Sequence, residues 1–128
     1  MTMTGHCLCG ATSFSYEGKE NWRSYCHCDS CRRFTGAPVA AYLAVPHGAW
    51  AWTGAEPRRY ESSPGTGWLS CATCGSAIAY DSDREPDEIH FMAALLDDPS
   101  GIVMQHHSHH EERLAWFNLH DDLPKHRG

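Results

Sequence analysis

The stretch YCHCDSCRRFTGAP, residues 25–38, holds three cysteines within six positions. They are Cys26, Cys28 and Cys31. Two further pairs flank this cluster, one spaced CxC at residues 7–9 and one spaced CxxC at residues 71–74. The total of seven is odd, and the two cysteines of a CxC pair lie too close in sequence to bridge each other without strain. Disulfides therefore account poorly for the pattern, and metal binding accounts for it better.

Seven cysteines divide into the two kinds of zinc site that proteins use. A structural site is closed by four ligands, whereas a catalytic site commonly has three protein ligands and one open position. The closed site is expected to take the first and last pairs, Cys7, Cys9, Cys71 and Cys74. The open site is expected to take the middle cluster, Cys26, Cys28 and Cys31. The first zinc would close a long loop and add its binding energy to folding, while the second would leave room for water or substrate.

Two alternatives stay open for the middle cluster. His6 or His27 could complete the second site and make it purely structural, although His27 lies between two ligands of a CxC turn and is expected to point away. The three thiols could instead remain free of metal and be redox active. A separate run of histidines lies at residues 106–110. A strand there would place His107 and His109 on one face, and His106, Ser108 and His110 on the other. That run is interpreted as a solvated strand edge.

The rest of the chain predicts an all-β protein of mainly antiparallel short strands, with at most one or two short helical turns. Alternating side chains predict a strand from Ala11 to Gly18. A helical turn is expected through CRRF, capped by Asp29 or Ser30 and ended by Gly36. Further strands are expected at 39–45, in WAWTG, RRYESS and TGWLSCA, after CATCG, and at 88–96 with Ile89, Phe91 and Ala93 on one face.

Length and targeting signals indicate one cytoplasmic domain. The 128 residues fit a single domain spanning 1–128, and 41% hydrophobic residues are ordinary for a globular protein. The first residues show neither a secretory signal nor an apolar run long enough to cross a membrane. A cytoplasmic location without membrane contact is therefore expected. Nothing in the sequence predicts the oligomeric state.

The charge distribution argues against nucleic-acid binding. The net charge is −6 with neutral histidines, and the basic residues are scattered apart from the pairs Arg32/Arg33 and Arg58/Arg59. A phosphate backbone would require a basic patch. The tryptophans are accordingly interpreted as core or rim residues rather than as stacking platforms. They are Trp22, Trp50, Trp52, Trp68 and Trp116.

Four segments together resemble the glutathione-dependent formaldehyde-activating enzyme family, which also includes centromere protein V. They are GHCLCGATSFSYEG (5–18), YCHCDSCRRFTGAP (25–38), WLSCATCGSAIAY (68–80) and HSHHEERLAWFNLHDDLP (107–124). The resemblance covers nearly the whole chain and implies a zinc-containing fold called a β-tent. It also implies the same division, with a structural zinc at the four flanking cysteines and a catalytic zinc at the middle three.

The resemblance further implies a carbon–sulfur lyase that joins formaldehyde to glutathione as S-hydroxymethylglutathione. A metal-coordinated thiol loses its proton, so glutathione or another thiol could bind as thiolate at the open three-cysteine zinc. Arg32 and Arg33 could grip a carboxylate of such a substrate, or could simply be exposed charges. The alternative is a non-enzymatic zinc-binding module for a protein partner, with nucleic acid the weaker choice because of the acidic balance.

Overall fold

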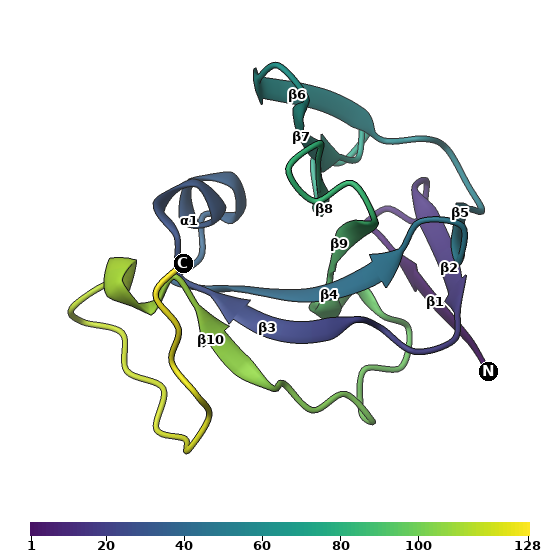
Figure 1. The fold of residues 1–128 in the computed structure, drawn as a ribbon. Helices are drawn as coiled ribbons and strands as arrows, with labels where there is room; N and C mark the ends of the chain where they lie inside the picture. Colours follow the sequence, from purple (N-terminus) through teal and green to yellow (C-terminus); the bar gives the residue numbers. More distant parts are fainter.

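The computed structural model describes residues 1–128, which form two β-sheets (Figure 1). The smaller sheet has three strands in the order β1 (Thr2–His6), β2 (Ser13–Glu17), β5 (Trp50–Trp52). The larger sheet has seven, in the order β10 (His106–Ser108), β3 (Trp22–Cys26), β4 (Ala40–Pro46), β9 (Glu88–Met92), β8 (Ala77–Ser82), β7 (Thr66–Ser70), β6 (Arg58–Ser63). All pairings are antiparallel except β10 with β3.

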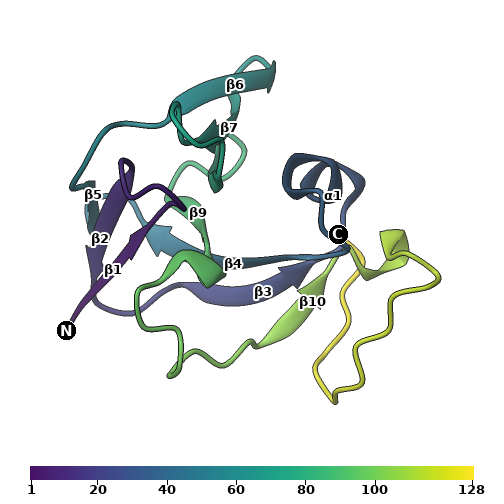
Figure 2. The same cartoon turned by 180° about the vertical axis from the view of Figure 1, so that it is seen from behind.

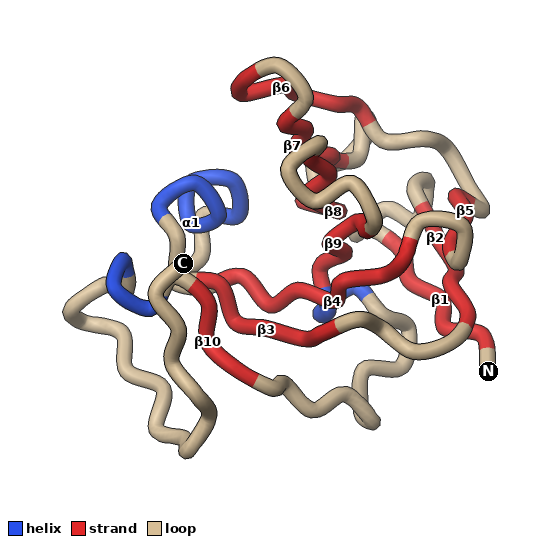
Figure 3. Tube along the Cα trace, viewed as in Figure 1, coloured by secondary structure: helices blue, strands red, loops and turns tan.

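Helical structure is confined to three short segments, which Figure 3 sets against the strands and loops. They are the α-helix α1 (Asp29–Thr35) and the 3₁₀ turns η1 (Ala93–Leu95) and η2 (His110–Glu112). The prediction of an all-β protein with little helix is confirmed. No helix here has the length and apolar character needed to cross a bilayer.

Strand register gives the large sheet two chemically different faces. Residues directly opposite on neighbouring strands share a face. One cross-strand row therefore runs through Leu43, Phe91, Ala79 and Leu69, all buried in the main core. The row that points the other way contains aromatic and small residues: Trp22, Ala44, His90, Tyr80 and Trp68. The first face packs the fold together, and the second is free to line a cavity.

The main core lies between the first face of the large sheet and the small sheet. Phe14 of β2 stacks on Phe91 of β9 with ring centroids 4.1 Å apart and planes 6° from parallel. Trp50 and Trp52 of β5 meet Phe91 edge-on, at 5.6 and 5.8 Å. Both Phe14 and Phe91 are fully buried, so this aromatic cluster joins the two sheets.

Phe91→Ala is expected to lower the free energy of unfolding by about 3–5 kcal/mol, because it removes the ring on which four other aromatic rings pack and leaves a cavity. Urea denaturation followed by tryptophan fluorescence measures the loss. Tyr60→Ala is the matched control, since Tyr60 is 66% exposed on β6 and its removal should change stability by no more than about 0.5 kcal/mol. Equal losses for the two variants would contradict this assignment of the core.

The large sheet bends so that the strands at one of its edges, β6, β7 and β8, lie on the same side as α1. Figure 1 shows α1 above one end of β3 and β4, with β6, β7 and β8 rising above the other end on the same side. The view from behind in Figure 2 agrees. The second face of the sheet, with its aromatic row, therefore forms the floor between these two walls.

Several expectations from the sequence need correction. Cys28, not Asp29 or Ser30, caps α1, and its Sγ accepts the Cys31 N–H; Gly36 ends the helix in the left-handed conformation as expected. The strand expected at 88–96 ends at Met92, because η1 begins at Ala93, although Ala93 is still buried in the main core.

Two further corrections concern the first strand and the last tryptophan. β1 was not predicted from the sequence, because its TMTGH segment has little apolar alternation and is held by pairing with β2. Trp116 is 71% exposed, which contradicts its interpretation as a core or rim residue. It lies between η2 and the following loop, where no strand covers it.

Candidate metal centres and their cavity

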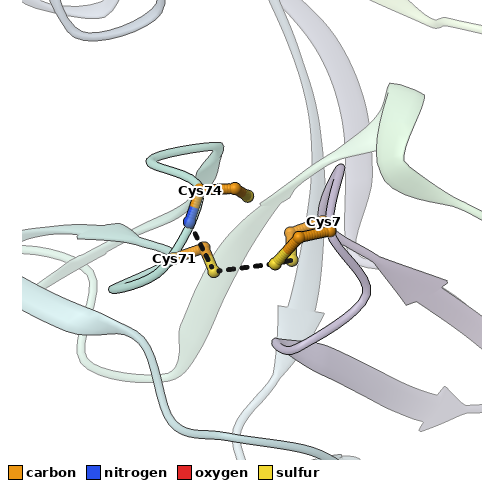
Figure 4. A group of neighbouring side chains, drawn as sticks. Cys7, Cys71 and Cys74 are labelled. Carbon is orange, nitrogen blue, oxygen red and sulfur yellow. Dashed lines mark hydrogen bonds between the residues drawn. The ribbon is translucent and has the colours of Figure 1, made fainter.

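The four flanking cysteines meet at one point, between the loop after β1 and the loop after β7 (Figure 4). The Sγ of Cys9 lies 3.7 Å from that of Cys7 and 3.8 Å from that of Cys71, and all four sulfurs, Cys74 included, lie within 4.8 Å of one another. A metal that binds thiolates at about 2.3 Å in a tetrahedron places its sulfurs about 3.8 Å apart. This cluster therefore fits a closed four-thiolate metal site.

The surrounding backbone favours thiolates in this cluster. The Cys7 Sγ accepts the Thr12 N–H at 3.3 Å, and the Cys71 Sγ accepts the N–H of Thr73 and of Cys74 at 3.4 and 3.5 Å. The Cys74 N–H is the main cause that lowers the pKa of Cys71, to about 5. The Ser76 hydroxyl is the main cause that lowers the pKa of Cys74, to about 7. At Cys9 the Ala11 N–H lowers the pKa, but burial and the neighbouring sulfurs outweigh it and raise the pKa to about 11. The loops therefore favour the thiolate, the form that binds metal, at Cys71 and Cys74.

The three middle cysteines form a second group at the junction of β3 and α1. Cys26 ends β3, Cys28 caps α1 and Cys31 lies in its first turn, so a short stretch of chain brings all three sulfurs within 4.8 Å of one another. The Cys31 Sγ lies 3.4 Å from that of Cys26 and 2.8 Å from that of Cys28. The second distance is about 1 Å shorter than a tetrahedral metal site requires, so the sulfurs of Cys28 and Cys31 would move apart around a bound metal. The group could hold a metal and supplies one ligand fewer than a closed site.

Hydrogen bonds connect the sulfurs of this second group. The hydrogen bonds from Cys26 and Cys31 lower the pKa of Cys28 and favour its thiolate. The same sulfur contacts, with Cys28 and Cys31, raise the pKa of Cys26, and burial raises it further. The buried Tyr42 hydroxyl donates to the Cys31 Sγ at 3.4 Å. A bound cation would replace the shared protons, so this site also fits a metal.

A cavity of about 640 Å³ opens directly on the three cysteines. Its floor is the aromatic face of the large sheet, and part of its wall is the β6–β7 hairpin with Ser62, Ser63 and Thr66. Residues with ionisable side chains also line the cavity: Arg84, Glu85, His109 and Glu112. The four flanking cysteines are not among its lining residues, so of the two groups it is the three-cysteine group that faces this cavity.

The arginines after the middle cluster lie elsewhere. Arg33 binds Asp29 through Nε at 2.9 Å, and Arg32 reaches the same carboxylate at 3.4 Å. Neither lines the cavity, so the hypothesis that they grip a substrate carboxylate is not supported. Arg84, in the turn after β8, lines the cavity and forms no ion pair within the chain. No sequence pattern indicated that Arg84 lines the cavity, because only the bend of the sheet brings this turn opposite α1.

His27 points away from the cysteines, as expected. Its Nε2 lies 2.8 Å from His107 Nδ1, and His107 Nε2 lies 3.0 Å from a carboxylate oxygen of Asp121. His107 is 1% exposed, so the interpretation of the histidine run as a solvated edge is wrong for this residue. His6 likewise is occupied, with Nδ1 bonded to Asp97. Neither histidine belongs to a cysteine group.

Sequence and fold are both similar to those of known proteins. A family model described as glutathione-dependent formaldehyde-activating enzyme matches residues 2–112. The chain is also similar in fold to a crystal structure of a Rhodobacter sphaeroides protein, a structural genomics target, with a TM-score of 0.63 and 24% identity over 79% of this chain and 91% of that one. No curated protein matches. Because the family model spans most of the sequence and includes both cysteine groups, the chain belongs to the glutathione-dependent formaldehyde-activating enzyme family.

Proposed function

We propose that the protein is a zinc-dependent carbon–sulfur lyase that adds a thiol to formaldehyde and reverses that addition. The observation that carries this proposal is the three-cysteine group, which is one ligand short of a closed site and faces a cavity of about 640 Å³. In this proposal Cys7, Cys9, Cys71 and Cys74 hold a structural zinc. Cys26, Cys28 and Cys31 hold the catalytic one.

The chemistry suits a soft metal site with sulfur ligands. When bound there, zinc supplies an open position that holds a substrate thiol as thiolate beside the aldehyde. Cys26, Cys28 and Cys31 fix that position relative to the cavity floor. The Tyr42 hydroxyl withdraws charge from the Cys31 sulfur by donating a hydrogen bond to it. Holding the two reactants together accounts for much of the expected rate increase.

The cavity supports a polar peptide thiol such as glutathione as the substrate. Glutathione carries two carboxylates and one ammonium group, and the cavity offers both signs of charge to receive them. The Arg84 guanidinium can donate two parallel hydrogen bonds to a carboxylate of the substrate. Glu85 lines the same cavity, and its carboxylate can bind the ammonium group. The hydroxyls of Ser62, Ser63 and Thr66 can bind the peptide backbone.

Exchange between labelled formaldehyde, glutathione and their adduct, followed by NMR, tests the proposal. Protein loaded with two zinc ions per chain is expected to accelerate exchange above the rate without protein. N-acetylcysteine, which has a carboxylate but no ammonium group, and a thiol that lacks charged groups serve as comparison substrates. We expect glutathione to exchange fastest, because only glutathione can bind both Arg84 and Glu85. No acceleration with any thiol would reject the lyase in favour of a binding module.

A further inference from the structure

His109 has an unusual backbone at the edge of the cavity. It is the only residue other than glycine with a positive φ, 50°, and it joins β10 to η2. The left-handed conformation costs free energy for a residue with a side chain and is often found at functional sites. The backbone is fixed there, because the His109 carbonyl accepts the Glu112 N–H at 3.0 Å and its own N–H donates to Gly128 at 3.4 Å.

Glu112 connects this histidine to the helix of the three-cysteine group. The Glu112 Oε2 lies 3.3 Å from His109 Nδ1. The other carboxylate oxygen, Oε1, accepts the N–H of Asp29, the first residue of α1, at 3.1 Å. Nδ1 therefore faces the Glu112 carboxylate, and Nε2 is the ring nitrogen turned away from it. Nε2 has no partner within the chain, and the side chain is 40% exposed.

The pairing of β10 with β3 places His109 beside the cysteines. Ser108 lies opposite Cys26, and its carbonyl accepts the His27 N–H at 3.1 Å. His109 follows directly, and it lines the same cavity as Cys26 and Cys28. It is nevertheless outside the three-cysteine ligand group. His109 therefore shares the cavity with the three cysteines without belonging to their ligand group, and it lies instead with Glu111 and Glu112.

Other proton carriers in the cavity are less well placed. His90 lies opposite Ala44, whereas Cys26 lies opposite Ala40, four residues further along β4. At about 3.3 Å per residue, this separation is about 13 Å along the strand. Tyr42 already donates its hydroxyl to Cys31. Of His90, Tyr42 and His109, only His109 follows the strand that pairs with Cys26 and keeps an unpaired ring nitrogen, Nε2.

We propose that His109, oriented by Glu112, transfers the proton in thiol addition to the aldehyde. This inference rests on the proposed function and names a residue for it. Nε2 takes the proton of the substrate S–H, the sulfur forms a bond to the aldehyde carbon, and the C=O π pair moves to oxygen. Nε2–H then gives the proton to that oxygen, so thiol and formaldehyde become the hydroxymethyl thioether with no other reactant. Cleavage runs the same steps in reverse.

His109→Gly tests the inference, because glycine adopts the φ of 50° without strain and leaves space for added imidazole. We expect formaldehyde–glutathione exchange to fall about 100-fold or more, with two zinc ions per chain and the fold retained. Imidazole in the buffer should restore part of the rate, which a purely structural residue would not permit. His120→Gly is the matched control, because His120 is exposed and lines no part of this cavity; it should exchange like wild type.

Three results would overturn the inference. Exchange at the wild-type rate in His109→Gly would show that no proton passes through this ring. A loss that imidazole does not restore would make His109 a structural residue, and a drop from two zinc ions to one would make it a metal ligand. Failure of the proposed function itself is distinct, because wild-type protein would then show no acceleration before any variant is compared.

Discussion

Cys71→Ser is expected to leave the protein unfolded. Its sulfur lies 3.8 Å from that of Cys9 in the four-cysteine group, which joins the loop after β1 to the loop after β7. A structural zinc contributes about 10–16 kcal/mol of binding free energy, whereas a domain is stable by only about 5–15 kcal/mol in total. Loss of one thiolate should therefore remove most of the net stability. Circular dichroism and zinc content of the purified variant measure both effects.

The same result should follow without mutation. A strong chelator added to wild-type protein should abolish the cooperative thermal transition, and added zinc should restore it. A Cys71→Ser protein that stays soluble, folded and loaded with two zinc ions would contradict the structural role of this group. The Cys28→Ser variant is the matched comparison, because it makes the same chemical change in the other cluster.

Cys28→Ser is expected to keep the fold, lose one of two zinc ions and lose all exchange activity. Cys28 caps α1 by accepting the Cys31 N–H at 3.2 Å. Serine is among the best residues at that position, so the helix should form as before. The remaining two sulfurs are too few to hold zinc at the cavity. We expect the melting temperature to change by only a few degrees, and exchange to match the rate without protein.

Zinc content and melting temperature must be read together for this variant. One zinc ion per chain with an intact transition and no exchange assigns the three-cysteine group to function. Unfolding would instead show that this group is structural, and it would contradict the proposal of an open substrate position there. Exchange at the wild-type rate with one zinc ion per chain would show that the reaction does not require Cys28, and it would reject the proposed lyase site.

Much of this protein could be predicted from its sequence because the controlling signals are local. The spacing of seven cysteines indicated a division into four and three, since ligand number is a property of the metal and not of the fold. Gly36 marked the end of α1, because its left-handed φ suits glycine. Short alternating segments predicted strands. The sequence did not predict β1, because that segment is only weakly apolar and forms a strand through its pairing with β2.

The cavity and its charged groups were decided by the tertiary structure alone. The register of β4 with β9 places His90 on the cavity floor, and Arg84 lines the same cavity as Cys31 of α1. The parallel pairing of β10 with β3 brings His109 to the cavity that Cys28 lines, although the two are far apart in sequence. Sequence determined which residues can bind metal, because ligand chemistry belongs to each side chain. Which of the two cysteine groups faces the cavity depends on long-range strand pairing, which no local pattern encodes.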